Sequence, residues 1–291
     1  MLYVSYITNR GLKPIVKPDD DQLGQYQLLA DTLSYQTLPR DRWRLVVTDE
    51  KNELPRPELE PLGDVAMYAR PPKTPWRERN SFSAASARNA GLRRILESSP
   101  KAGSVVLGLD DCCRLPADLL EQVEKLAGDG MYLAPFCCTA SRRPSPRDRI
   151  RPRSSVGGIV AYPLDAAVEV RMHEERFDGA ISLEDIEFGE RLQRVCGVRF
   201  VENNAKVFLL HHDRAKRRRE KCGTLVHFLL RENHQANVPW TSDQLKILCG
   251  PCPFCSGSRC QINKGECKGP ITPTEEAVSI MKGYESKPWP W

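Results

Sequence analysis

The feature that most constrains the fold is a regular alternation of strand-like and helix-like segments over about the first 210 residues. Short apolar runs indicate buried strands, and apolar residues that recur every three or four positions indicate helices. The expected strands are 2–8, 43–48, 65–68, 104–109, 158–162 and 207–210, and the expected helices are 23–36, 83–98, 184–196 and one that opens at Pro116. This order predicts an α/β fold with a mixed sheet flanked by helices.

Length and composition fit one large domain with a small appendage. The chain has 291 residues, of which 40% are hydrophobic and 28% are charged, as in ordinary globular proteins. Cys, Gly and Pro dominate after residue 240, so we place one domain at 1–240 and an appendage at 241–291. No apolar run is long enough to span a membrane, and the start lacks the pattern of a signal peptide. We therefore expect a cytoplasmic protein, in the host cytoplasm if a virus encodes it.

Acidic residues and a histidine follow several of the expected strands. Asp49, the pair Asp110-Asp111 and His211 each come where an apolar strand ends. In α/β sheets, ligands bind beyond the carboxyl ends of the strands. Carboxylate oxygens suit Mg²⁺ or Mn²⁺, and imidazole is tolerable for Mn²⁺. An Asp pair after a strand is also common as a plain turn, so this pattern alone is weak evidence for a metal site.

A second acidic pair, Glu184-Asp185, opens the helix expected at 184–196. The positive end of the helix dipole favours ionised carboxylates at this position. An ionised carboxylate next to a reaction centre can act as a general base. The alternative interpretation is an ordinary acidic first turn, which many helices have.

The order of these motifs resembles that of family-2 glycosyltransferases with the GT-A fold, especially the galactosyltransferase-type branch. The match covers about residues 1–212. It rests on these segments, in this order: Val4 to Arg10, Ser34 to Pro39, the strand end at Asp49, Ser86 to Gly91, Leu109 to Pro116, Gly179 to Leu192, and His211. The resemblance implies transfer of a sugar from a nucleotide-diphosphate sugar, with Mn²⁺ or Mg²⁺ as cofactor.

The resemblance also implies roles for individual residues on the donor side. Asp49 would contact the base or ribose of the donor. Arg88 and Asn89 would lie near its phosphates and support the acidic turn, and the opening segment would contribute Thr8 and Arg10.

Further roles follow for the metal and the reaction. Asp110 matches the first position of the family's Asp-x-Asp motif, and His211 would be a further metal ligand. Asp185, with Glu184 beside it, would be the base that deprotonates the acceptor hydroxyl in an inverting displacement.

The chain departs from the family at one position, because Cys112 stands where the second Asp of the Asp-x-Asp motif is expected. A thiol is a poor ligand for Mg²⁺. We therefore expect Asp111 to take over the metal contact, beside Asp110. A softer metal near Cys112, or a weaker dependence on metal, are the alternatives.

The appendage has five of the 11 cysteines within residues 249–267, spaced as Cys249, Cys252, Cys255, Cys260 and Cys267. Thiolates at such short spacing suit a closed tetrahedral zinc site. We expect the first four to bind a structural Zn²⁺, since so small a segment needs a staple. An iron–sulfur cluster is the lesser alternative.

Two basic runs indicate an anionic partner. Segment 141–153 has six Arg against one Asp, and segment 211–221 has six Lys or Arg against two acids. A single such run is usually a solvated face, but two of them favour a polyanion. We expect the acceptor to be a hydroxymethyl pyrimidine in DNA, as for virus-encoded DNA-modifying glycosyltransferases. The alternatives are a cell-surface saccharide or glycolipid as acceptor, and a non-catalytic nucleic-acid-binding protein on a decayed GT-A scaffold.

Overall fold

In the computed structural model, the described residues are 1–8, 24–71, 84–111, 113–126, 131–133, 136–139, 149–150, 159–178, 180–181, 184–198, 200–202, 207–210, 221–222, 226, 230, 236, 241, 243, 255–256 and 259–260. None of the helices in this part is long and apolar enough to cross a membrane.

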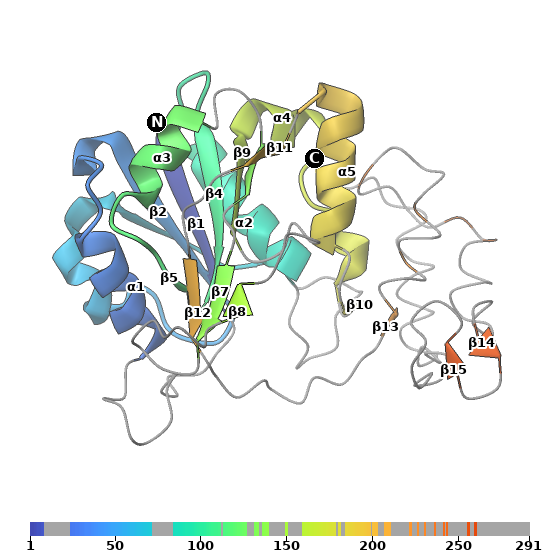
Figure 1. Cartoon of the computed structure of the whole chain (residues 1–291), viewed down its shortest axis with the longest axis horizontal. Helices are drawn as coiled ribbons and strands as arrows, with labels where there is room; N and C mark the ends of the chain where they lie inside the picture. Colours follow the sequence, from blue (N-terminus) through green and yellow to red (C-terminus); the bar gives the residue numbers. More distant parts are fainter. Residues whose placement is uncertain are drawn as a thin grey trace.

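The main layer is a seven-stranded mixed sheet (Figure 1). Across the sheet, its strands are β11 (Phe200–Glu202), β6 (Met131–Leu133), β9 (Ile159–Pro163), β4 (Val105–Asp110), β1 (Leu2–Thr8), β2 (Trp43–Asp49) and β3 (Ala66–Ala69). Strands β4, β1, β2 and β3 run parallel, whereas β9 is antiparallel to both of its neighbours. The sheet is therefore mixed, as the sequence predicted.

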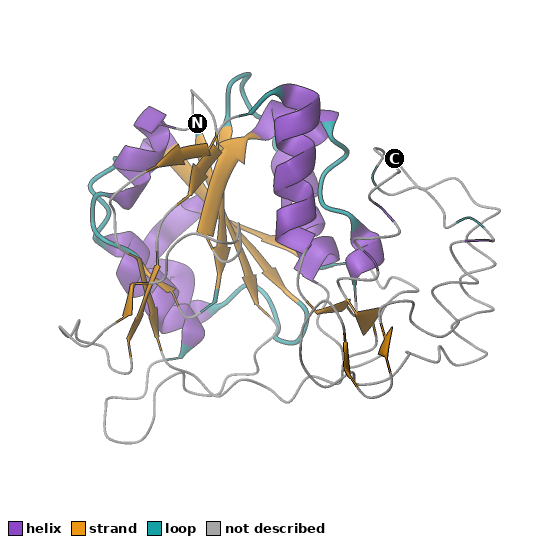
Figure 2. Cartoon of the chain, turned by 45° about the vertical axis from the view of Figure 1, so that its right-hand side comes forward, coloured by secondary structure: helices purple, strands orange, loops and turns teal. Residues whose placement is uncertain are grey.

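Helices cover both faces of this sheet (Figure 2). They are α1 (Gln25–Ser34), α2 (Ala84–Glu97), α3 (Leu119–Leu126), α4 (Leu164–Glu169) and α5 (Glu184–Cys196), with the 3-10 turns η1 (Arg40–Arg42), η2 (Pro57–Val65) and η3 (Glu175–Phe177). One apolar cluster joins the sheet to α1, η2 and α3, and the other joins it to α2, α4 and α5. Every residue of β1 is buried, as expected for a central strand packed on both faces.

Strand β12 (Val207–Leu210) differs from the expectation, because it does not join the seven-stranded sheet. It lies in a four-stranded sheet with β5 (Cys113–Arg114), β7 (Phe136–Thr139) and β8 (Arg149–Ile150). β12 is parallel to β7 and antiparallel to β5, with Leu209 opposite Cys113. The end of β12 therefore lies beside the strand that follows the acidic turn. A four-residue run such as 207–210 does not show from its sequence which strand it will pair with.

Two short pairs complete the described strands. β10 (Ala180–Ile181) pairs with β13 (Lys221–Cys222), and β14 (Cys255–Ser256) pairs with β15 (Arg259–Cys260). The second pair places Cys255 opposite Cys260 in the appendage. Cys249 and Cys252 lie outside the described residues, so the structure does not test the zinc prediction.

Helix α2 packs closely on the central strands at Gly91. A Cβ atom at this position would lie 2.6 Å from Ser5 Oγ on β1 and 3.2 Å from Thr48 Oγ1 on β2. Both distances are shorter than ordinary van der Waals contact, so Gly91 lets the helix lie close to the sheet. Arg88, one turn earlier on α2, is brought to the carboxyl ends of the strands by this packing.

We predict that Gly91→Ala lowers the free energy of unfolding. Overpacking a buried contact costs roughly 1–3 kcal/mol, whereas replacing Gly by Ala inside a helix returns about 1 kcal/mol. In a Ser5→Ala background the nearest clashing atom is gone, and Gly91→Ala should then be neutral or stabilising. Urea denaturation of the four proteins measures this. Equal losses from Gly91→Ala in both backgrounds would contradict the close contact between α2 and β1.

Candidate functional site

The carboxyl ends of three parallel strands meet at one edge of the sheet. Thr8 pairs with Asp49 across β1 and β2, and Ile7 pairs with Asp110 across β1 and β4. Three polar side chains, Thr8, Asp49 and Asp110, therefore end neighbouring strands at this edge. Ligands of α/β sheets bind at edges of this kind.

The acidic turn follows β4 and is held partly by β1. Asp110 is the last residue of β4, and Asp111 begins the turn after it. The Thr8 hydroxyl lies 3.2 Å from Asp111 Oδ2 and 2.9 Å from Gln25 Oε1, in donor geometry to both. A hydroxyl has one proton to donate, so these two acceptors compete for it. Cys112 lies outside the described residues.

Arg88 joins the acidic turn to the start of α5. Its Nη1 and Nη2 each donate to Asp110 Oδ1 over 3.1 Å, and Nη2 also lies 3.1 Å from Asp185 Oδ1. The Arg88 side chain is 9% exposed, Asp185 is 15% exposed and Asp110 is 39% exposed. One buried guanidinium thus lies between a carboxylate at a strand end and a carboxylate at a helix start, and Asp110 faces solvent more than Asp185 does.

Glu184 and Asp185 are the first two residues of α5. Both are half-buried, and the dipole of α5 favours their ionised forms. The structure therefore brings Asp185 to the same cluster as Arg88 and Asp110, and it places Glu184 next to Asp185 in the same turn.

Burial dominates the electrostatics of Asp185. The pKa of Asp185 is raised from 3.8 to about 8, and desolvation is the largest cause. The charge of Arg88 opposes this rise, and the negative charges of Glu184 and Asp110 add to it. Burial also tends to lower the pKa of Arg88, but Asp185, Asp110 and Glu184 outweigh it and raise that pKa. A carboxyl that titrates near neutral pH inside an acidic cluster is suited to accept a proton.

Asp49 is fully buried, and its carboxylate has four donors within the protein. Oδ1 accepts from the backbone N–H of Lys51 (2.7 Å) and of Asn52 (3.1 Å). Oδ2 accepts from Asn52 Nδ2 (2.6 Å) and from the Tyr26 hydroxyl. Burial, followed by this contact with Asp49, raises the pKa of Tyr26. Asp49 therefore shapes the loop after β2, and its expected contact with the donor stays a prediction.

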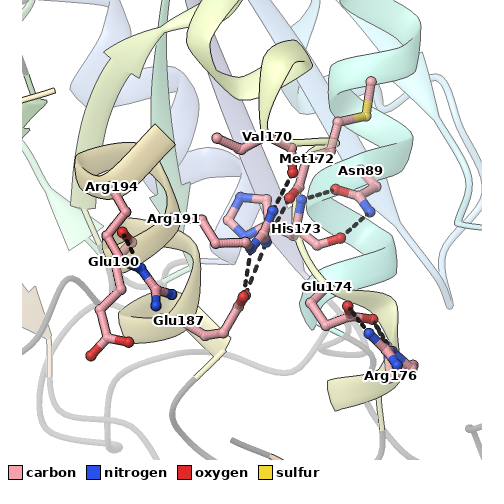
Figure 3. A network of polar contacts seen from close by, with 10 residues as sticks. All are labelled: Asn89, Val170, Met172, His173, Glu174, Arg176, Glu187, Glu190, Arg191 and Arg194. Carbon is pink, nitrogen blue, oxygen red and sulfur yellow. Dashed lines mark hydrogen bonds and ion pairs between the residues drawn. The ribbon is translucent and has the colours of Figure 1, made fainter. Parts of the chain in front are cut away.

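Asn89 is also fully buried, and its side chain faces the backbone of His173 (Figure 3). Its amide nitrogen donates to the backbone oxygen of His173 (2.8 Å) and to Glu175 Oε1 (2.9 Å). Its amide oxygen accepts from the backbone N–H of His173 (2.8 Å). Asn89 thus fastens α2 to the segment after α4, and its expected contact with donor phosphates stays a prediction.

The described residues include only some of the expected metal ligands. In the part of the chain that the structure describes, no group of three or more His, Cys, Asp or Glu is arranged to hold a metal ion. Asp110 and Asp111 are adjacent there, whereas His211 and the expected donor contact Arg10 lie outside it. Mg²⁺ commonly takes one or two protein carboxylates and completes its shell with phosphate oxygens and water. Two adjacent carboxylates at a partly exposed edge fit that donor set.

A buried charged run next to the site was not predicted from the sequence. His173, Glu174, Glu175, Arg176 and Asp178 are all buried. Glu174 forms an ion pair with Arg176 at 2.8 Å. Asp178 Oδ1 accepts a hydrogen bond from the backbone N–H of Ser86, a residue of α2, at 3.2 Å. Such a run normally indicates a solvated surface, and only tertiary packing shows that it supports α2.

Solved structures, but no protein-family model and no curated protein, are similar to this chain. Among solved structures, GalNAc-T7 with UDP, GalNAc and Mn²⁺ is 12% identical over 80% of this chain and 48% of that chain, with a TM-score of 0.51. S. aureus TarS in complex with UDP is 11% identical over 72% of this chain, with a TM-score of 0.47. The chain spans 60% of that TarS structure. The likeness to GalNAc-T7 supports a fold of the GT-A type, as expected.

We predict that Asp185 makes stability depend on pH. Because folding raises the pKa of Asp185 from 3.8 to about 8, the folded state favours its protonated form. This contribution is fully present below about pH 4 and is lost as the pH rises through about 8. Asp185→Asn mimics the neutral form, so its melting temperature relative to wild type should rise over this range.

Thermal unfolding between pH 4 and 9 measures this difference, with Asp41→Asn as the matched control at an exposed position. A difference for Asp185→Asn that stays constant with pH, or that falls as the pH rises, would contradict the raised pKa.

Proposed function

We propose that the protein is a glycosyltransferase that moves a sugar from a nucleotide-diphosphate sugar to an acceptor hydroxyl with inversion. The observation that carries this proposal is the Arg88 guanidinium, which lies 3.1 Å from both Asp110 and Asp185. It links a carboxylate suited to the donor side with a half-buried carboxylate suited to proton transfer. The GT-A fold supports the proposal, and the GalNAc-T7 structure of this fold holds UDP, GalNAc and Mn²⁺.

On the donor side, Asp110 and Asp111 would hold Mn²⁺ or Mg²⁺ together with the donor diphosphate. Such an ion neutralises the charge that develops on a diphosphate leaving group. Thr8 donates toward Asp111 from β1, which would keep this carboxylate in place. Arg88 keeps Asp110 at the edge of the sheet and adds positive charge next to the phosphates.

His211 would be the third protein ligand. The antiparallel register places Leu209 opposite Cys113, so β12 runs toward the acidic turn. This register supports the assignment of His211, which otherwise rests on the sequence.

On the acceptor side, the Asp185 carboxylate would accept the proton of the attacking hydroxyl. The hydroxyl oxygen forms a bond to the anomeric carbon while the bond from that carbon to the diphosphate oxygen breaks. Asp185 must be ionised to act as base. Since its pKa is about 8 in the free protein, kcat/KM should rise with pH through about 8.

We propose DNA with a hydroxymethyl pyrimidine as the acceptor. The support is the sequence of the two basic runs, 141–153 and 211–221, which fall almost entirely outside the described residues. Their Arg and Lys side chains would bind phosphates without reading base sequence. The modified base would have to leave the stack for its hydroxyl to reach Asp185.

Structural zinc in the appendage is part of the same proposal. The hairpin that places Cys255 opposite Cys260 is compatible with a compact cysteine site. A stapled appendage would give the chain an additional rigid surface.

The decisive experiment incubates the full chain, Mn²⁺ and a panel of labelled nucleotide sugars with hydroxymethylated DNA or with plain DNA. We expect label on hydroxymethylated DNA only. Asp185→Asn should lower kcat by roughly 10²–10⁴-fold, the usual contribution of a general base. Asp41→Asn is the control and should transfer sugar as the wild type does.

The other outcomes separate the alternatives. Hydrolysis of the donor by water without transfer to either DNA would favour a saccharide or glycolipid acceptor. Salt-sensitive DNA binding without donor hydrolysis or transfer would favour a non-catalytic binding protein and would overturn the proposal.

A further inference from the structure

Arg191 lies on α5, six residues after Asp185, and its side chain is 2% exposed. It is among the largest fully buried side chains in the described residues. A guanidinium in such a place costs free energy unless its N–H groups have partners. The contacts that Arg191 makes therefore indicate what it holds in place.

The Arg191 guanidinium joins its own helix to the segment that follows α4 (Figure 3). Nη1 donates to the backbone oxygen of Val170, and Nη2 donates to the backbone oxygen of Met172 at 2.8 Å. Nε and Nη2 also contact the two carboxylate oxygens of Glu187, one turn earlier on α5. The planar fork of Arg suits this arrangement, and the compact ammonium of Lys does not reproduce it.

The segment that Arg191 holds has an unusual backbone. Val170 caps the end of α4, and the next two residues, Arg171 and Met172, have φ values of 60° and 61°. Left-handed backbone is costly for residues with a Cβ atom. The carbonyl groups on either side of Arg171 are bound by the Arg191 guanidinium, which stabilises this tight crossing from α4 toward α2.

The other end of the same segment is fastened to α2. Asn89 exchanges hydrogen bonds with the backbone of His173, and Glu175 accepts from Arg93 Nη2 at 2.5 Å. The segment 170–175 thus binds α5 through Arg191 and α2 through Asn89. Helix α2 carries Arg88 and helix α5 carries Asp185.

We infer that Arg191 is a positioning residue that fixes the start of α5 relative to α2, so that Asp185 faces Arg88. This role rests on the proposed function only in taking Asp185 as the base. Arg191 touches neither Asp185 nor Arg88 in the contacts above, and it acts through the 170–175 segment.

Apolar packing is the competing explanation for the position of α5. Phe188 stacks on the His173 ring with centroids 3.9 Å apart, and Phe188 and Leu192 are both fully buried. If these contacts alone place the helix, the loss of Arg191 lowers stability without changing the surroundings of Asp185. The experiment must therefore read out Asp185 separately from stability.

The test compares Arg191→Met, Arg191→Lys and Arg194→Met with wild type. Met retains much of the apolar stem of Arg without its charge. Arg194 is exposed on the same helix and donates within that helix, to the backbone oxygen of Glu190 at 3.3 Å. It is therefore the matched control. In each protein, the ¹³C resonance of the Asp185 carboxyl, assigned with Asp185→Asn, is followed between pH 4 and 10, and melting temperature is recorded.

We expect Arg191→Met to move the titration midpoint of Asp185 by at least about half a pH unit, with a smaller shift for Arg191→Lys and none for Arg194→Met. A rise would reflect withdrawal of Arg88, and a fall would reflect entry of water; either one supports the positioning role. A lower melting temperature with an unchanged Asp185 midpoint would overturn it. Since this readout needs no sugar transfer, its result does not depend on the proposed function.

If the protein transfers sugar, a second readout applies. Arg191→Met should lower kcat while the KM for the donor stays within about twofold, because the loss falls on the base and not on the phosphate site. Arg191→Lys should restore part of the loss. A rise in donor KM with unchanged kcat would contradict the inference.

Discussion

One buried guanidinium organises the candidate site. Arg88 is nearly enclosed, yet it lies between Asp110 and Asp185, each 3.1 Å away. Without Arg88, two carboxylates would face one another in a partly desolvated place, and the charged forms of both would be disfavoured. With Arg88 between them, the end of β4 and the start of α5 lie close together. The proposed donor and acceptor sides meet there.

The rest of the fold places these three charges. Gly91 lets α2 lie against β1 and β2, which brings Arg88 to the edge of the sheet. The parallel register of β1 and β4 brings Thr8 beside the acidic turn. Arg191 and Asn89 fasten the segment between α4 and η3 to α5 and α2. These helices carry Asp185 and Arg88. Buried polar groups need partners, so each of these contacts also constrains the geometry of the site.

Sequence reasoning predicted the parallel strands, α2, α5 and the acidic residues at their ends, because hydrophobic periodicity and strand-end position are local signals. It missed α4, whose six residues are too few to show a helical period. It assigned β12 to the main sheet, because the choice of a strand's partner is not local. Asp49 was predicted as a polar residue at a strand end, but its burial was not predicted. It made no prediction for run 173–176, since nothing local shows that Glu174 and Arg176 pair inside the protein.

The most direct test of the donor site is the affinity for Mn²⁺, measured by titration calorimetry of the full chain with and without UDP. We predict that tight Mn²⁺ binding requires UDP and that Asp110→Asn and Asp111→Asn each weaken it by about tenfold or more. Cys112→Ser should change it by less than about twofold, because a thiol is a poor ligand for a hard cation. Mn²⁺ binding that is the same in wild type and in both Asp variants would contradict a metal site at the acidic turn.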